Sequence, residues 1–363
     1  MSQLLQRLGL APFRQRFPWI GPDPQTLRNT LRPAKPEPET GHFLEFALPA
    51  GDRLLARLDL PGVGIPPHGL VVVVHGLGGC SDDGGQRRLG KALSRLGFGV
   101  LRLNLRGAGP GRPLAKGTYA ANCSRDLLPV LRDCRRLARD LAPSGGQMPL
   151  GAVGLSLGGT VLLNALLDGE GLDPPLLDGL VCISSPLDLH RCAVQMERPR
   201  NTLYRTWLVR RLIQQTLADP FGLPDGERRG LQGHRRPRTI RAFDDGITAP
   251  RWGFADVGTY YNACSPWPRL LQALDRLPPL LLVHAKDDPW VPVESLLALA
   301  AELAARQGRV NAGAWFGPWP EVVVTDQGGH NGFHAPGDCD EGCWSDQLAA
   351  LWLRQVLVSR TAN

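Results

Sequence analysis

Ser156 stands at the centre of a Gly-Leu-Ser-Leu-Gly-Gly run that joins two apolar segments, 149–153 and 160–167. This order predicts a buried strand, a sharp turn and a helix, with the serine at the point of the turn. Glycine on either side lets strand and helix approach closely and tolerates the backbone strain that pushes a hydroxyl out of such a turn. The serine is therefore a candidate nucleophile, and the alternative is a serine that only caps an ordinary helix.

A serine hydroxyl becomes a good nucleophile only when a base removes its proton. Two later loops supply partners, each directly after an expected strand: Asp287 and Asp288 follow 280–284, and His330 follows 321–325. We expect His330 to be the general base and an aspartate of the earlier loop to orient its ring. Asp288 is favoured because it directly precedes a Pro-Trp-Val-Pro run, while Asp287 stays the alternative acid or a brace of the loop.

Attack on a carbonyl also requires two backbone N–H groups that stabilise the oxyanion. We expect one from Leu157, which follows the nucleophile, and one from Leu77, which lies in the glycine-rich loop 75–79 after the apolar strand 70–74. His75 is expected to brace this loop rather than to act as a base. The loop lacks both the G-K-[ST] ending and the G-x-G-x-x-G spacing of phosphate-binding loops, which argues against nucleotide binding.

Alternating strands and helices position these residues. Besides the strands already named, the pattern predicts a hairpin (43–48 and 53–60), strands at 98–103 and 177–184, and helices at 86–96, 126–141, 203–217 and 344–358. Continuous apolar strands are typical of a parallel sheet that is buried on both faces. The fold class predicted is α/β, with a mostly parallel, doubly wound sheet whose site forms at the carboxyl ends of the strands.

The domain organisation follows from where this pattern stops and resumes. We expect an extended, proline-rich N-terminal arm anchored by aromatic and apolar side chains, a core in two parts, and a helical lid inserted between strands. The arm covers 1–40 with anchors at Phe13, Phe17, Trp19 and Ile20, the core covers 41–185 and 278–363, and the lid covers 186–277. In the lid, Leu203, Trp207, Leu208 and Leu212 are candidates to line an acyl pocket or simply to pack.

Composition limits the other classes of function. The 363 residues carry a formal charge of +7, with no nucleic-acid motif, so no nucleic-acid partner is expected. No apolar run is long enough to span a bilayer and no secretory signal is visible, which predicts a cytoplasmic protein. The eight cysteines form no C-x-x-C pair. His334, Cys339 and Cys343 make a poor zinc set, so we expect no metal site.

The motifs taken together resemble one branch of the α/β-hydrolase superfamily, the YheT-like hydrolases or AB hydrolase type 4 family. The resemblance covers nearly the whole chain. It is carried by the segments 22–27, 75–79, 104–107, 154–159, 185–189, 243–245, 248–250, 253–254, 260–261, 285–289 and 328–333, together with Ser265. The sequence departs from the Tyr-His-Ala-Gly pattern of many relatives at Tyr119-Ala-Ala-Asn122.

The resemblance implies an α/β-hydrolase fold and a carboxylic ester hydrolase with the triad Ser156, Asp288 and His330, and for some relatives acylglycerol lipase activity. The residues themselves predict the same enzyme: a serine esterase that forms an acyl-enzyme and requires no cofactor. A thioesterase or acyltransferase with the same triad is the first alternative, and a non-catalytic binding protein on this fold is the second. The expected partner is a small-molecule ester, including acyl-lipids, and contact of the basic loop 227–241 with a membrane surface is not indicated.

Overall fold

An eight-stranded sheet forms the centre of the molecule in the computed structural model, which describes residues 2–32, 41–62, 64–143, 146–169, 175–309, 319–338 and 342–358. The strands follow the order β1-β2-β4-β3-β5-β6-β7-β8. Their bounds are β1 His42–Ala47, β2 Arg53–Asp59, β3 Leu70–Val74, β4 Gly99–Leu103, β5 Leu150–Leu155, β6 Gly179–Ile183, β7 Leu280–Ala285 and β8 Glu321–Thr325.

The directions of the strands confirm the predicted fold class. β1 pairs with β2, and β2 with β4, in antiparallel fashion, whereas every later pair from β4 to β8 is parallel. The carboxyl ends of β3, β5, β7 and β8 therefore lie along one edge of the sheet, which is where such sheets form their sites.

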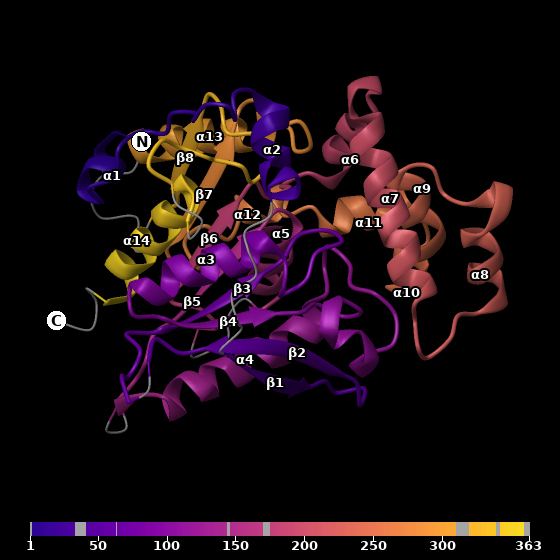
Figure 1. The fold of residues 1–363 in the computed structure, drawn as a ribbon, viewed down its shortest axis with the longest axis horizontal. Helices are drawn as coiled ribbons and strands as arrows, with labels where there is room; N and C mark the ends of the chain where they lie inside the picture. Colours follow the sequence, from indigo (N-terminus) through magenta and orange to yellow (C-terminus); the bar gives the residue numbers. More distant parts are fainter. Residues whose placement is uncertain are drawn as a thin grey trace.

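Helices cover both faces of the sheet (Figure 1). Successive side chains of β3 point to opposite faces, so that Val72 and Val74 pack with α4 and α5, and Val71 and Val73 pack with α1, α3 and α14. The bounds are α1 Ser2–Arg7, α2 Pro22–Leu31, α3 Gly84–Arg95, α4 Ser124–Asp140, α5 Leu157–Asp168, α13 Glu294–Arg309 and α14 Trp344–Val358.

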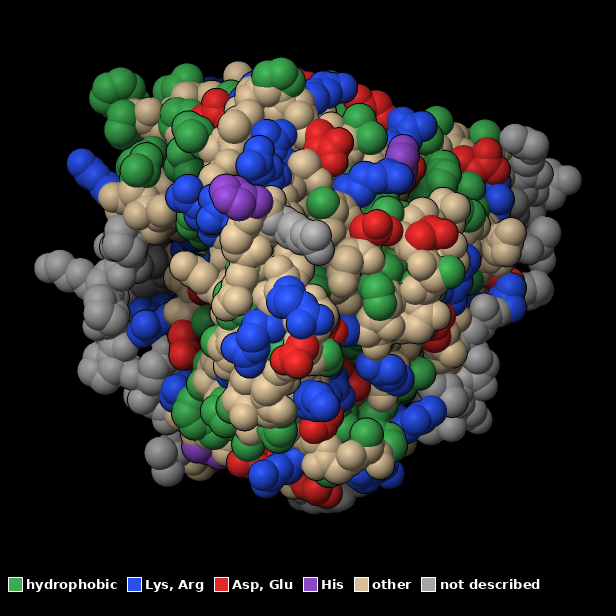
Figure 2. All heavy atoms as spheres, turned by 90° about the vertical axis from the view of Figure 1, so that its right-hand side faces the viewer, with side chains coloured by type: hydrophobic (Ala, Val, Ile, Leu, Met, Phe, Trp, Pro, Cys, Tyr) green, Lys and Arg blue, Asp and Glu red, His purple; other side chains and the backbone are tan. Residues whose placement is uncertain are grey.

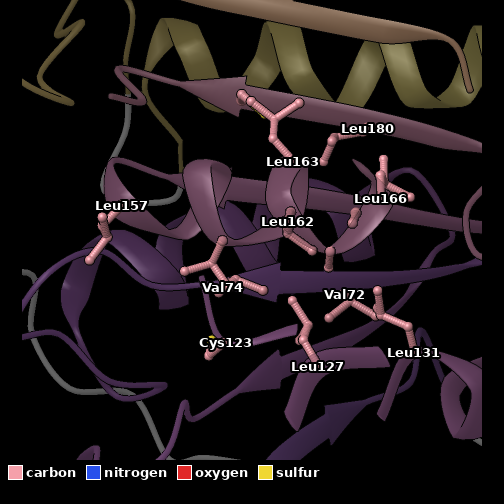
Figure 3. Packing of buried hydrophobic residues seen from close by; sticks show 14 of the residues in the cluster. Val72, Val74, Cys123, Leu127, Leu131, Leu157, Leu162, Leu163, Leu166 and Leu180 are labelled. Carbon is pink, nitrogen blue, oxygen red and sulfur yellow. The ribbon is translucent and has the colours of Figure 1, made fainter. Parts of the chain in front are cut away.

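Helix α5 is buried almost all round because it lies between the sheet and α4. Leu162 and Leu166 of α5 meet Val72 of β3 and Leu127 and Leu131 of α4 in one apolar cluster (Figure 3). This packing holds the helix that begins directly after Ser156, so the position of the serine is set by the core rather than by a loop.

The segment between β6 and β7 is helical, as the sequence predicts for a lid, and it stands beside the carboxyl edge of the sheet (Figure 1). Its helices are α6 Leu189–Glu197, α7 Thr202–Leu217, α8 Asp225–Leu231, α9 Ile240–Phe243, α10 Ala249–Arg251, α11 Val257–Cys264 and α12 Trp267–Leu270. Basic and acidic side chains are interspersed on the outer face of this region (Figure 2). No helix among the described residues is long and apolar enough to cross a membrane.

The N-terminal arm is helical over much of its length, which corrects the expectation of an extended segment. Pro22 and Pro24 open α2, where the first turn has no hydrogen bond for a proline to break. Of the expected anchors, Phe13 packs edge-on against Phe333 and Trp344, but Phe17 and Ile20 are 85% and 52% exposed. The buried anchors of this segment are instead Leu4, Leu5 and Gln25.

Candidate active site

Ser156 connects the end of β5 to the start of α5 with a φ of 53°, a left-handed conformation that is strained for a residue with a side chain. The neighbouring glycines make this turn possible. A Cβ at Gly158 would lie 2.3 Å from the carbonyl oxygen of Val74, and one at Gly159 would lie 2.1 Å from the hydroxyl of Ser185. Strand β3 and the end of β6 therefore approach the turn too closely for any larger residue.

The structure brings Ser156, His330 and Asp288 together, although they are far apart in sequence. The Oγ of Ser156 lies 2.9 Å from Nε2 of His330, and Nδ1 of His330 lies 2.8 Å from Oδ2 of Asp288. His330 and Asp288 are 5% and 6% exposed, so water competes little for these hydrogen bonds. The geometry is that of a nucleophile, a base and a group that orients the base.

The two adjacent aspartates have different partners, and this favours Asp288 over Asp287 as the acid. Burial opposes ionisation of Asp288, but the His330 and His284 imidazoles and backbone N–H groups hold its pKa below the ordinary value. Its Oδ1 accepts hydrogen bonds from the N–H groups of Trp290 and Val291. Asp287 instead accepts from the N–H of Gly329 at 2.8 Å, and burial raises its pKa, so it braces the loop of His330.

The glycine-rich loop 75–79 lies directly against the serine. A Cβ at Gly76 would be 2.9 Å from Cβ and 3.4 Å from Oγ of Ser156, so the Gly76–Leu77 peptide adjoins the hydroxyl. The Tyr119 hydroxyl braces this loop, because it accepts from the N–H of Gly78 at 2.7 Å and donates to the carbonyl of Gly76 at 3.1 Å. The two expected oxyanion donors, Leu77 and Leu157, both line the same cavity as the serine.

His75 has the structural position that the sequence predicts for it. Its Nδ1 lies 2.8 Å from the carbonyl of Gly76, and its Nε2 accepts from the N–H of Leu105 at 3.1 Å. Burial lowers the pKa of His75, which keeps the ring neutral and able to accept that hydrogen bond. The ring thus joins the loop after β3 to the loop after β4.

Helix α2 holds the loop that carries His330. The hydroxyl of Thr26 accepts a hydrogen bond from the N–H of His330 at 2.9 Å. The buried amide of Gln25 donates to the carbonyl of His334 and accepts from its N–H, at 3.1 and 2.7 Å. Asp23 of the same helix binds Arg200 and Tyr204 of the lid, so α2 joins the lid to this loop.

Trp290 stacks on His330 with ring centroids 4.5 Å apart and an angle of 26° between the rings. Tyr204 of α7 in turn packs edge-on against Trp290 at 5.3 Å. The indole covers one face of the imidazole, which leaves the ring few orientations besides the one that joins Ser156 to Asp288.

A cavity of about 290 Å³ opens above the serine, between the edge of the sheet and the lid. Its lid side is mostly apolar, with Leu189, Ala193, Met196, Leu208, Leu212 and Phe243 in the lining. Leu208 and Leu212 therefore line the pocket, one of the two roles considered for them, whereas Leu203 and Trp207 are 83% and 49% exposed and do not line it. Helix α7 also holds the loop 75–79, since Arg211 and Gln215 both donate to the carbonyl of Gly78.

No group of three or more histidine, cysteine or acidic residues in the described part of the chain is arranged to hold a metal ion. Cys339, one member of the weak zinc set considered from the sequence, lies outside the described residues.

Comparison with known proteins agrees with this fold. Residues 69–335 match the family described as alpha/beta hydrolase fold, which is well over half of the chain. The chain therefore belongs to the alpha/beta hydrolase fold family, and its class is that of the carboxylic ester hydrolases.

Individual relatives place the chain near the branch whose motifs it resembles, and so confirm that resemblance. The putative esterase YheT of Escherichia coli is 29% identical over 80% of this chain and 78% of its own length. Medium-chain fatty acid ethyl ester synthase/esterase 2 of Saccharomyces cerevisiae is 29% identical over 65% of this chain, which spans only 53% of the yeast protein. A solved esterase of Pyrococcus furiosus has a TM-score of 0.53 at 15% identity, covers 87% of this chain and 91% of its own, and shares the fold.

Sequence reasoning missed the residues that support the site from other elements. Thr26, Tyr119 and Trp290 each contact a loop that is far away in sequence, and no local pattern shows such a contact. A signal existed for Thr26 and for a further supporting residue, Tyr260, because the segments 22–27 and 260–261 belong to the motifs of the resemblance. The hydroxyl of Tyr260 accepts from the N–H of Ala121 in the segment that follows Tyr119.

Proposed function

We propose that this protein is a serine carboxylic ester hydrolase in which Ser156, His330 and Asp288 form the catalytic triad. The observation that carries the proposal is the unbroken chain of hydrogen bonds from the serine hydroxyl through both ring nitrogens to the carboxylate. A neutral imidazole that donates its Nδ1–H to Asp288 has a lone pair on Nε2, which faces the proton of the hydroxyl.

In the proposed reaction, Oγ of Ser156 attacks the ester carbonyl carbon while Nε2 of His330 takes the hydroxyl proton. The N–H groups of Leu77 and Leu157 stabilise the negative oxygen of the tetrahedral intermediate. The imidazolium then protonates the leaving alcohol, and the acyl group stays on Ser156. A water molecule that loses its proton to His330 attacks the acyl-enzyme, releases the acid and restores the serine.

The apolar lining on the lid side supports an ester with an aliphatic acyl chain. Burial of each methylene against Met196, Leu208 and Leu212 contributes about 0.8 kcal/mol to binding. A series of p-nitrophenyl esters of rising chain length tests this. We expect kcat/KM to rise with length and then fall when the chain exceeds the cavity.

Labelling with a fluorophosphonate probe tests the nucleophile. We expect the wild type to label and Ser156→Ala not to, with Ser94→Ala, a serine of α3 outside the cavity lining, as the matched control. Equal labelling of wild type and Ser156→Ala would contradict the proposal and favour a non-catalytic role. His330→Ala should lower ester turnover by at least about 10³-fold, as loss of a triad base does.

Acyl transfer to an alcohol is the second candidate function, because the yeast relative is named both a synthase and an esterase. The same acyl-enzyme serves both reactions, and only the acceptor differs. Product analysis with a p-nitrophenyl ester and added ethanol separates them: the free acid indicates hydrolysis, and the ethyl ester indicates transfer.

A further inference from the structure

The cavity above Ser156 has a second side that differs from the lid side. Helices α2, α3 and α14 line it with polar residues: Thr26, Asn29, Gln86, Arg88, Ser345 and Asp346. An ester has two substituents on its carbonyl carbon. If the acyl chain lies among the apolar residues of the lid, the alcohol portion has this polar side available to it.

Gln86 is the polar residue on this side that lacks partners. It is 2% exposed, yet neither Oε1 nor Nε2 of its amide has a hydrogen-bond partner among the described residues. A buried amide without partners costs free energy, and native structures rarely keep one without a reason. An amide that lines a cavity and remains unpaired is therefore well suited to a ligand that pairs with it.

The first turn of α3, which carries Gln86, lies against the residue that precedes the proposed nucleophile. A Cβ at Gly85 would be in ordinary contact, at 3.7 Å, with the side chain of Leu155, the residue that precedes Ser156. Both Leu155 and Gln86 line the same cavity as Ser156 and His330. The amide therefore lies in the same cavity that a substrate held at the serine would occupy.

The charges beside Gln86 neutralise each other. The Nε of Arg88 donates to Asp346 at 2.5 Å and its Nη1 donates to Asn29 at 2.9 Å. Asp346 also accepts from the N–H of Cys343 at 2.9 Å. Because this ion pair is closed, neither Arg88 nor Asp346 is free to pair with a charged group of the substrate. An amide that can both donate and accept suits a neutral hydroxyl group.

We propose that Gln86 is a substrate-binding residue that selects esters whose alcohol portion carries a neutral hydroxyl group. The amide accepts from that hydroxyl through Oε1 and donates to it or to a neighbouring oxygen through Nε2. The acyl chain lies among the lid helices. This proposal rests on the proposed function of Ser156.

Two esters with one acyl chain test the proposal: the butyl ester and the 3-hydroxypropyl ester, which replaces the terminal methyl with a hydroxyl. The acyl chain is the one that gives the highest rate in the p-nitrophenyl series. We expect the wild type to favour the hydroxypropyl ester in kcat/KM. Gln86→Met keeps the length and flexibility of the side chain without its amide, and we expect it to reduce that preference by about tenfold.

Gln272→Met makes the same change at an exposed glutamine outside the cavity, and it should keep the wild-type preference. Gln86→Asn keeps the amide on a side chain that is one methylene shorter. Its preference for the hydroxypropyl ester should lie between those of the wild type and Gln86→Met. A wild type that does not favour the hydroxypropyl ester overturns the proposal, whether or not the variants fold. An unchanged preference in folded Gln86→Met also overturns it. Turnover of both esters by Ser156→Ala would instead contradict the proposed function.

Discussion

The hydroxyl of Thr26 accepts a hydrogen bond from the backbone N–H of His330, a residue 304 positions later in the chain. The same hydroxyl donates to the carbonyl of Pro22 one turn earlier in α2. The loop of His330 packs directly against this helix, since a Cβ at Gly329 would lie 2.5 Å from the Pro22 carbonyl oxygen. The first helices of the chain thus position the proposed general base, and Thr26 is a positioning residue.

Replacement of Thr26 by valine, which has the same shape without the hydroxyl, tests this role. We expect kcat for a p-nitrophenyl ester to fall about tenfold while KM changes little, because a small misplacement of the base affects the transition state more than binding. Thr26→Ser should restore most of the rate. Thr30→Val, at an exposed position of the same helix, is the control. Equal rates for Thr26→Val and Thr30→Val would show that the bond does not position His330.

The neighbouring aspartates provide a matched pair of variants. Asp288→Asn should lower kcat by about 10⁴-fold, because the amide cannot hold the tautomer of His330 or stabilise its imidazolium. Asp287→Asn should lower kcat only severalfold, since the amide oxygen can still accept from the N–H of Gly329. Steady-state rates at pH 8 compare the two. A larger loss in Asp287→Asn would reverse the assignment of the acid.

Tyr119→Phe removes the hydroxyl that holds the peptides on both sides of Leu77. We expect kcat to fall 10- to 100-fold, less than the 10²- to 10³-fold typical of losing an oxyanion donor itself, because Leu77 keeps its N–H but loses its support. The free energy of unfolding should fall by about 1–3 kcal/mol, since the N–H of Gly78 is left unpaired. Initial rates measure the change in kcat, and urea denaturation measures the change in the free energy of unfolding. A rate equal to that of the wild type would contradict a role of Tyr119 in holding Leu77, the proposed oxyanion donor.

Asp244, which lines the cavity from the lid, predicts a pH dependence of stability. Burial raises its pKa to about 6, against hydrogen bonds from the Thr248 and Tyr261 hydroxyls that lower it. Between about pH 4 and pH 6 the folded state keeps a proton that the unfolded state has lost, so this residue makes the free energy of unfolding fall as pH rises.

Asp244→Asn removes that titration. The difference in free energy of unfolding, wild type minus variant, should therefore decrease from pH 4 to pH 6 and then level off. Urea denaturation at four pH values between 4 and 7 measures it. The pKa of Asp338 is also raised to about 6 by burial, but its contribution is common to both proteins and cancels in the difference. If the free energies of unfolding of the wild type and Asp244→Asn changed with pH in the same way, the raised pKa of Asp244 would be contradicted.

Much of the fold could be predicted because its strands are short, continuous apolar runs. The observed bounds of β3, β8 and α14 equal the predicted ranges, and α3, α4 and α7 differ by two residues or fewer at each end. The sequence analysis does not predict helix α13, which lies between β7 and β8. Helices α1 and α2 were missed because prolines were interpreted as marks of extended chain, although Pro22 begins a helix.

The sequence predicts that the three central residues of the proposed site lie together, because each follows a strand and parallel strands bring their carboxyl ends together. Residues that support the site from other elements could not be predicted from the sequence. The partners of Thr26 and Tyr119 are set by how helices and loops pack on one another, and neither residue has a pattern of its own. The unpaired amide of Gln86 also becomes visible only when the burial and neighbours of every polar atom are known.

The crowding around Gly158 and Gly159 limits how this enzyme could be altered. Backbone from β3 and the Ser185 side chain fill the space beside the turn, so almost any substitution there would displace the proposed nucleophile. The lid residues Met196, Leu208 and Leu212 line the cavity from α6 and α7 and are not part of this turn. Directed evolution toward new esters should therefore accumulate changes at these cavity-lining positions and leave the glycines untouched, so that selectivity can change while the turn stays intact.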